Sequence, residues 1–210
     1  DIKKSPGLIK LQGAVNIEHV LTGLPPLRSK ISKGLDSPDD WAAAILKQAN
    51  RVFQESEPRS NLRNISNHML DTCRHLKSHA PTVAHSYKSP APISSKVPES
   101  LRDWLLNDQP SAVLNHESRG HIPEDLGRYL FCSCWAEAHK DSGISIPKAD
   151  DFPKALKPKH LNWNSGHFAD RFRVQAKGRP ATTITSHISK DGHYFIHYDP
   201  TQCRSLTVRE

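Results

Sequence analysis

Basic side chains that could bind phosphate groups are concentrated in the last third of the sequence. Residues 152–210 contain ten Lys or Arg and four Asp or Glu, so this stretch supplies six units of the chain's net charge of +7. Lys and Arg neutralise nucleic-acid phosphates in a way that does not depend on base sequence. A solvated basic surface would have the same composition. The concentration of charge in one stretch favours phosphate binding.

Several polar residues of this stretch have the chemistry needed to contact DNA. Arg can donate two hydrogen bonds to guanine, and Gln can form a matching pair with adenine, in the major groove. The candidates for phosphate or base contacts are Arg171, Arg173, Gln175, Arg179, Lys190 and His193. Lys190 and His193 flank a predicted turn, from which they could reach a backbone phosphate. Arg173 has an alternative role as an ion-pair partner of Asp170.

Metal-binding chemistry is disfavoured by the spacing of the histidines and cysteines. His116 and His121 lie five residues apart, so they would not share a helical face as in the zinc-protease motif, which they otherwise resemble. A second group, on a predicted helix, consists of His68, Cys73, His75 and His79. Only Cys73, His75 and His79 of this group could approach one another, and a fourth ligand is not evident. The Cys132-Ser133-Cys134 spacing is too tight for a zinc knuckle. We expect no metal site, which disfavours a zinc-dependent nuclease.

Helical elements are expected to fill the first two thirds of the chain. Ser37 and Pro38 have the residue types of an N-cap and a first helical position, and the apolar residues that follow recur at helical spacing. Further helices are predicted after Ser60, from Pro98, and from Pro123 to about residue 139, with a short element at Ile17–Leu21. Residues 80–97 are rich in Pro and Ser and indicate a surface loop.

A β-hairpin is predicted near the end of the chain. Residues 182–188 and 193–198 are rich in β-forming residues, and Asp191-Gly192 lies between them as a hairpin signal. The fold class expected is therefore α+β, with a helical middle segment and a small twisted antiparallel sheet that includes the hairpin 182–198.

Composition limits the class of protein. The 210 residues include sixteen prolines, and no apolar run approaches the roughly 20 residues that cross a bilayer. Four cysteines in no scaffold pattern favour a reducing cytoplasm. The first residue is Asp1, and residues 207–210 have the form of a capping box, which opens a helix. We expect the chain to be a fragment of a longer protein.

The stretch 179–210 resembles the C-terminal half of bacterial DNA (cytosine-5) methyltransferases. Thr183-Ile184 matches the Thr–aliphatic dipeptide of the family's target-recognition region, and residues 204–210 match the start of its ninth conserved block. Upstream, residues 15–27 resemble the segment after the eighth block. Asn115 and His116 with Arg119 resemble the entry to target recognition. Residues 28–110 match nothing in the family, in which this part varies with the DNA target.

The resemblance implies roles for individual residues. Thr183 would hold the backbone beside the flipped cytosine, and Ile184, Asn115, His116 and Arg119 would belong to the same DNA-binding set. The alternative for Thr183 is selection for β propensity alone. Structural roles are implied for Arg204, Thr207 and Glu210, with Arg204 tying the preceding strand to the helix that the capping box would open.

The family's catalytic motifs are missing from this sequence. It contains no Pro-Cys-Gln segment for the nucleophile, no Glu-Asn-Val segment and no glycine-rich loop for S-adenosyl-L-methionine. The resemblance implies that the parent enzyme methylates cytosine C5 after base flipping, as in restriction-modification systems. The chain alone would be inactive, without catalytic residues or cofactor. Its expected partners are double-stranded DNA and the missing catalytic lobe of the same polypeptide, in the bacterial cytoplasm at the nucleoid and at no membrane.

Three regions are expected. Residues 1–36 would form an irregular connector from the catalytic lobe, 37–110 a helical variable insert, and 111–210 the target-recognition region with the hairpin and the start of the ninth block. The alternative function is a stand-alone DNA-binding protein derived from a methyltransferase.

Overall fold

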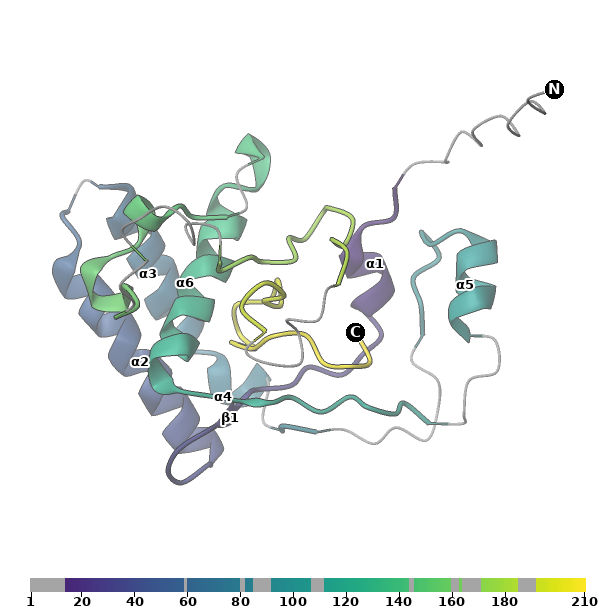
Figure 1. Cartoon of the computed structure of the whole chain (residues 1–210), viewed down its shortest axis with the longest axis horizontal. Helices are drawn as coiled ribbons and strands as arrows, with labels where there is room; N and C mark the ends of the chain where they lie inside the picture. Colours follow the sequence, from purple (N-terminus) through teal and green to yellow (C-terminus); the bar gives the residue numbers. More distant parts are fainter. Residues whose placement is uncertain are drawn as a thin grey trace.

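Helix α6 (Pro123–Ala138) lies between a layer of helices and the irregular segments 171–184 and 192–210 (Figure 1). The structure is a computed structural model that describes residues 14–58, 60–79, 82–84, 92–106, 112–143, 146–159, 163, 171–184 and 192–210. All residues from 126 to 136 of α6 are buried. A helix buried on every side must be covered by several elements, so α6 organises the core. Ala138, at the end of the helix, is exposed.

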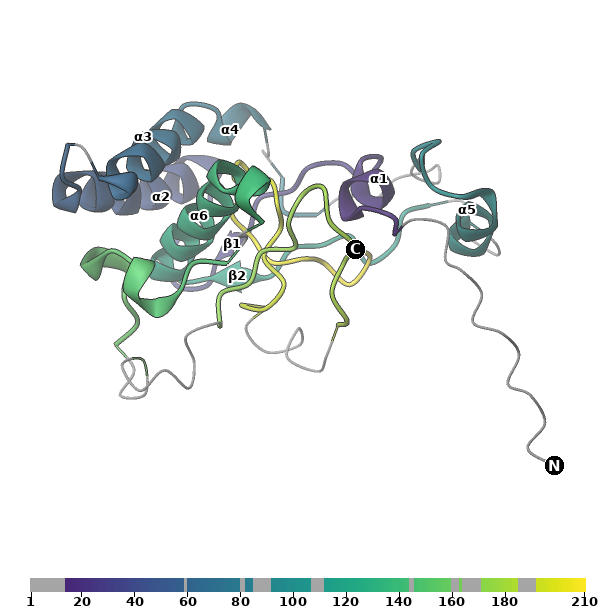
Figure 2. The same ribbon diagram turned by 90° about the horizontal axis from the view of Figure 1, so that it is seen from above.

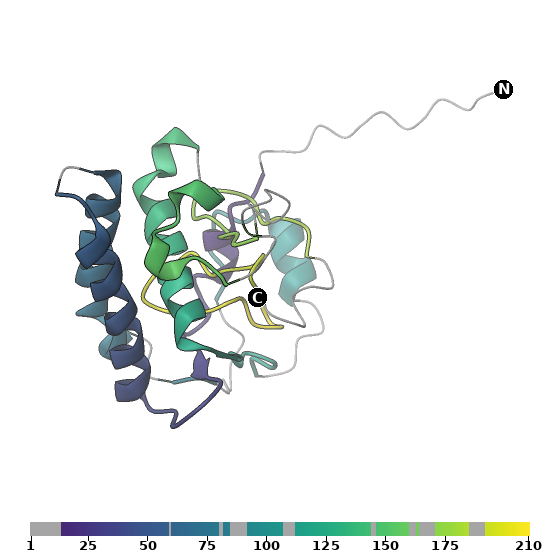
Figure 3. The same ribbon diagram turned by 60° about the vertical axis from the view of Figure 1, so that its left-hand side comes forward.

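Helices α2 (Pro38–Glu55), α3 (Asn61–Cys73) and α4 (Leu76–His79) form the layer on one side of α6 (Figure 3). The predicted start of α2 is confirmed, because Pro38 opens the helix and the Ser37 hydroxyl accepts a bond from the Asp40 N–H at 3.0 Å. The hydroxyl of Ser60 caps α3 in the same way, at 3.2 Å from the Arg63 nitrogen. These caps satisfy N–H groups that have no partner inside a helix.

Gly127 permits the close approach of α2 to α6. A Cβ atom at position 127 would lie 2.6 Å from Cβ and 2.8 Å from Cγ of Gln48, and 3.1 Å from Cδ2 of Leu156. The nearest of these atoms is a Cβ, which cannot move away without its backbone. The glycine therefore sets the spacing of the two helices.

We expect Gly127→Ala to destabilise the fold, because overpacking of a core typically costs about 1–3 kcal/mol. Alanine's helix propensity offsets up to about 1 kcal/mol of that cost. Urea unfolding of the variant measures the difference, and Ala43→Gly on the exposed face of α2 reports the propensity term alone. Unfolding at an equal or higher urea concentration than wild type would contradict the close-packing interpretation.

The α+β class is confirmed, but the sheet differs from the prediction. Strands β1 (Lys30–Ile31) and β2 (Gly120–His121) are parallel, with Lys30 opposite Gly120 and Ile31 opposite His121. An antiparallel sheet was expected. The two strands are far apart in sequence, and the chain between them makes a long crossover through the helical layer, which is the connection that parallel strands require.

The segment predicted as a hairpin pairs differently in its described part. Ile196 forms a parallel bridge with Val174 and an antiparallel bridge with Ser205, whereas residues 182–184 adopt no strand. The predicted turn and most of the first strand, residues 185–191, lie outside the described residues. Within the part described, the backbone of residues 193–197 therefore bonds to segments 173–175 and 204–206, which lie on either side of the hairpin sequence.

Helices α1 (Ile17–Leu21) and α5 (Glu99–Leu106) lie on the side of the molecule away from α2 and α3 (Figure 2). A second, smaller core joins Ile17 and Leu21 of α1 to Phe195 and Leu206. This core brings the start of the described chain against its end. Among the residues that the structure describes, no helix combines the length and the apolar character of a membrane span.

Candidate nucleic-acid interface

Residues 171–184, here called the recognition segment, contain most of the DNA contacts predicted from the sequence. Their backbone is held against residues 193–196: the Arg173 N–H donates to the His193 carbonyl at 2.8 Å, and the Gln175 N–H donates to Ile196 at 2.9 Å. The Ile196 N–H returns a bond to the Arg173 carbonyl, also at 2.9 Å. The first half of the recognition segment is therefore fixed to residues 193–196 by a ladder of backbone hydrogen bonds.

Gln175 is buried, with 3% of its surface exposed. Its side-chain oxygen accepts from the Thr182 N–H at 3.0 Å, and its amide nitrogen donates to the Thr182 hydroxyl at 2.8 Å and to the Tyr194 carbonyl at 3.2 Å. The side chain predicted to read adenine instead ties the two halves of the recognition segment together. This arrangement favours a positioning role for Gln175 over contact with a base.

A turn at residues 176–179 reverses the recognition segment. Gly178 has φ +80°, a backbone conformation that favours glycine, and its N–H donates to the Glu18 carboxylate at 2.6 Å. The Arg179 carbonyl accepts from the Ile17 N–H at 2.9 Å. The guanidinium of Arg179 donates to the Gly143 carbonyl at 2.7 Å, although the residue is exposed. The turn is thus anchored to α1.

Thr183 and Ile184 lie at the end of this anchored segment and are exposed, Ile184 by 48%. Thr182 and Ile184 line a groove of about 160 Å³ beside Leu206, and Thr183, the residue between them, does not. The Thr183 side chain is therefore presented to solvent from a backbone whose preceding residue is held by Gln175. A rigid support of this kind is what a phosphate-holding hydroxyl requires.

A buried ion-pair cluster lies among the last residues of the chain. Arg204 is 1% exposed, and its two terminal nitrogens donate to the Glu210 carboxylate at 2.5 and 2.6 Å. Arg204 also donates to the Gln202 side chain and to the Leu27 carbonyl. Burial would raise the pKa of Glu210, but the Arg204 charge and hydrogen bonds hold this pKa well below its usual range.

The capping box expected at residues 207–210 is formed. The Thr207 N–H donates to the Glu210 carboxylate at 2.8 Å, and the Glu210 N–H donates to the Thr207 hydroxyl at 3.3 Å. The same Thr207 hydroxyl lies 3.2 Å from Nδ1 of His116. Arg204, Thr207 and Glu210 therefore belong to one network of buried hydrogen bonds and ion pairs.

The three residues assigned to the entry of target recognition occupy different environments. His116 is 2% exposed, and its ring bridges Thr207 and the Pro25 carbonyl, at 2.8 Å from the latter. Asn115 is exposed and has φ +60°. Arg119 is half-buried, and its carbonyl accepts from the Lys30 N–H in the β1–β2 pairing. His116 thus links chain segments, and Asn115 remains accessible to a ligand.

The remaining predicted DNA contacts lie at the other end of the recognition segment. Arg171 and Arg173 are half-buried, and the Arg173 guanidinium lies 5.3 Å from the centre of the Tyr194 ring. His193 is 7% exposed, with Nδ1 2.8 Å from the Tyr129 hydroxyl. Lys190 and Asp170, the alternative ion-pair partner of Arg173, lie outside the described residues. The structure therefore separates Arg171 and His193 from Thr183 rather than gathering all the candidates at one point.

The four cysteines are poorly suited to nucleophilic chemistry. Cys132, Cys134 and Cys203 are buried, and Cys73 is half-buried. Burial raises the pKa of the Cys73 thiol to about 12 and moves the pKa values of the other three upward as well. Since the thiolate is the nucleophilic form, none of the four is activated. The described part of the chain also holds no group of three or more His, Cys, Asp or Glu arranged to bind a metal ion.

Comparison with known proteins identifies a methyltransferase that is similar to part of the chain. Over 108 residues the chain is 47% identical to the Type II methyltransferase M.Bpa9945I of Bacillus paralicheniformis. The aligned region covers 51% of this chain and 22% of that protein, so the chain spans well under two thirds of its relative. No family model matches the chain, and no solved structure matches it. The similarity supports a relationship to methyltransferases over about half of the chain.

Proposed function

We propose, on the premise of this similarity to a Type II methyltransferase, that the chain is the DNA-recognition part of a DNA (cytosine-5) methyltransferase. The observation that carries the proposal is the 47% identity over 108 residues. In this role the chain binds double-stranded DNA, selects the target sequence and holds the strand while the cytosine turns out of the helix. The cytosine-5 assignment rests on the Thr183-Ile184 dipeptide and on residues 204–210.

The chemical step is proposed to belong to a catalytic lobe that acts with this chain. That lobe would bind S-adenosyl-L-methionine and supply the thiolate that attacks cytosine C6. The four unactivated cysteines described above support this division of labour. The purified 210-residue chain should therefore incorporate no labelled methyl group into DNA above a mock preparation. Incorporation above that level would contradict the proposal.

Binding to duplex DNA tests the proposal directly. The chain should bind a duplex of about 24 base pairs with an affinity that falls steeply as salt rises, because phosphate contacts release counterions. Fluorescence anisotropy at several salt concentrations measures this slope. An undetectable affinity at low salt, or one independent of salt, would overturn the proposed function.

Thr183 gives the sharpest residue-level prediction. Thr183→Val keeps the side-chain shape and removes the hydroxyl, so the bond to phosphate is lost. Such a bond to a charged group contributes about 1.5–3 kcal/mol, which corresponds to a loss of roughly ten- to hundredfold in methylation rate. The rate is measured in the complete methyltransferase. The melting temperature should change little, because substitutions at exposed positions usually shift stability by no more than about 0.5 kcal/mol.

The matched control is Thr183→Ser, which keeps the hydroxyl and should retain most of the activity. Thr182→Ala, the neighbouring change on the opposite side of the backbone, is unsuitable because the Thr182 hydroxyl is bonded to Gln175. Equal losses in the Val and Ser variants, or a loss explained by unfolding, would show that the Thr183 hydroxyl does not hold a phosphate.

A further inference from the structure

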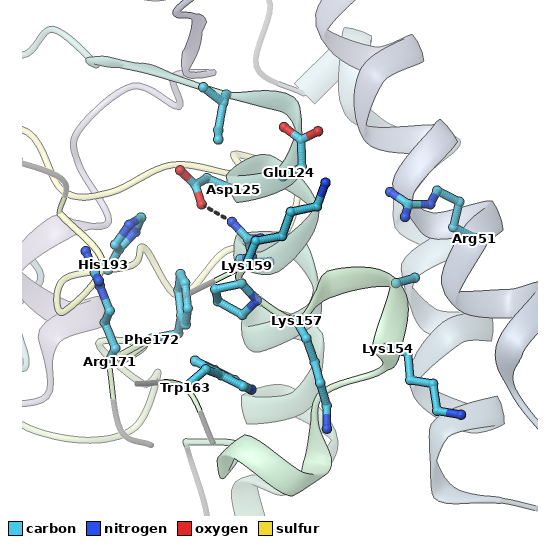
Figure 4. Close-up of a pocket in the computed structure, with 14 residues that line it drawn as sticks. Arg51, Glu124, Asp125, Lys154, Lys157, Lys159, Trp163, Arg171, Phe172 and His193 are labelled. Atoms are coloured by element: carbon cyan, nitrogen blue, oxygen red, sulfur yellow. Dashed lines mark hydrogen bonds and ion pairs between the residues drawn. The ribbon is translucent and has the colours of Figure 1, made fainter. Parts of the chain in front are cut away.

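A basic cleft lies between α2, the start of α6 and the short helix η3 (Lys154–Leu156) (Figure 4). Arg171, the first residue of the recognition segment, lines it. The volume of the cleft is about 610 Å³. The cationic side chains that line it are Arg51, Arg128, Lys154, Lys157, Lys159 and Arg171. The two carboxylates in the lining are Glu124 and Asp125. Of these six cations, only Arg171 was among the DNA contacts expected from the sequence.

The cationic side chains that line the cleft outnumber its two carboxylates, and one of these carboxylates, Asp125, is paired with a cation of the same cleft. Asp125 accepts from Arg128 at 2.5 Å. Glu55, at the end of α2, accepts from the backbone nitrogens of Lys154 and Ala155 at 2.5 and 2.8 Å. In the part of the chain that the structure describes, no ion pair involves Lys154, Lys157 or Lys159. The lysines therefore give the cleft an uncompensated positive charge.

The backbone that carries these lysines is fixed. Glu55 holds the start of η3 against α2, and Nε of Arg128 donates to the Leu156 carbonyl at 2.8 Å, which holds its end against α6. Pro153 and Pro158 restrict the chain on either side. Because the supports come from two helices packed in the core, the spacing of the lysines is set by the fold.

The aromatic residues of the cleft indicate which nucleic-acid groups it can contact. Trp163, Phe172 and His193 are exposed by 4%, 3% and 7%. Proteins that bind single strands present aromatic faces on which bases stack, and these rings are too buried to do so. The accessible groups are the lysine and arginine side chains, which suit backbone phosphates.

We propose that the basic cleft holds backbone phosphates of duplex DNA flanking the target site, as a second contact distinct from Thr183. The inference rests on the proposed function and deepens it. It gives the helical insert a role, since α2 contributes Arg51 and the support for η3. Arg171 lines the cleft at one end of the recognition segment and Thr183 lies at the other, so one segment connects the two contacts.

The test compares two double variants of the 210-residue chain. Lys154→Gln/Lys157→Gln removes two charges from the cleft, and Lys33→Gln/Lys96→Gln removes two from exposed positions outside it. Each phosphate contact contributes about 0.9 to the slope of log affinity against log salt. The cleft variant should bind a duplex of about 24 base pairs more weakly, with a slope shallower by about 1.8. The control should retain the wild-type slope, and both should keep the wild-type melting temperature.

The outcomes separate the cleft from the proposed function. A cleft variant with the wild-type slope, or a control that loses as much as the cleft variant, would overturn the second contact while the wild-type chain still binds duplex DNA. A larger loss on single-stranded than on duplex DNA would also overturn it. The proposed function fails by a different result, namely absence of duplex binding by the wild-type chain.

Discussion

Arg204→Leu is expected to destabilise the fold by about 3–5 kcal/mol, because it leaves the Glu210 carboxylate buried without its partner. The Glu210 side chain is 1% exposed, and both carboxylate oxygens accept from Arg204. The change also removes the bonds from Arg204 to Gln202 and to the Leu27 carbonyl. Since small domains are stable by only about 5–15 kcal/mol, urea unfolding should show a large shift of the midpoint.

Two further variants isolate the cause of this loss. Arg74→Leu breaks the Arg74–Asp71 pair, which is exposed on both sides, and should change stability by no more than about 1 kcal/mol. Arg204→Leu/Glu210→Leu removes both charges and should recover part of the loss, because the uncompensated carboxylate is gone. If the double variant lost as much stability as Arg204→Leu and Glu210→Leu lose together when each is measured alone, the buried unpaired charge would not be the cause.

Mild acid, between pH 7 and pH 5, should destabilise the protein, because His197 is held neutral in the fold. Burial, followed by the Arg204 charge, lowers the pKa of His197 to about 4. Nδ1 of His197 accepts the Asp199 N–H at 3.1 Å, and Nε2 lies 3.6 Å from Glu210. The ring therefore carries its proton on Nε2 and uses Nδ1 as an acceptor. Protonation of Nδ1 would remove that bond.

The direction of the pH effect follows from this lowered pKa. Above an unfolded-state pKa of about 6.5 both states are neutral and the full stability is present. As pH falls, His197 is protonated in the unfolded chain, whereas in the folded protein its ring stays neutral until about pH 4. Stability should therefore fall by about 2 kcal/mol between pH 7 and pH 5. His68 acts in the opposite direction, because its hydrogen bond to Glu137 raises its pKa, but it is partly exposed and solvent weakens its contribution.

Urea unfolding at the two pH values measures this loss. His197→Asn places an amide oxygen near the position of Nδ1, so it can accept from Asp199 without titrating. The variant should lose most of the difference between pH 7 and pH 5, whereas His75→Asn, at an exposed position of the helical layer, should keep it. A wild-type protein equally stable at both pH values would show that His197 titrates normally.

The features that were predictable from sequence depend on residues close together in the chain. Ser37 with Pro38, and Ser60, mark helix starts because the cap bonds reach only three residues ahead. The capping box of Thr207 and Glu210 is local in the same sense. Such interactions need no knowledge of the rest of the fold, so the helix positions and this motif follow from short stretches of sequence.

The features that required the three-dimensional structure depend on partners far apart in the chain. Gln175 resembles a base-reading residue in the sequence. In the structure it is buried, and its amide nitrogen donates to the Thr182 hydroxyl and to the Tyr194 carbonyl. The parallel direction of β1 and β2 and the pairing of Ile196 with Val174 and Ser205 are set by the path of the whole chain. The basic cleft arises because Gly127 lets α2 approach α6 and Glu55 holds η3 against them. No local pattern encodes these contacts, since each becomes favourable only after the core that unites distant segments has formed.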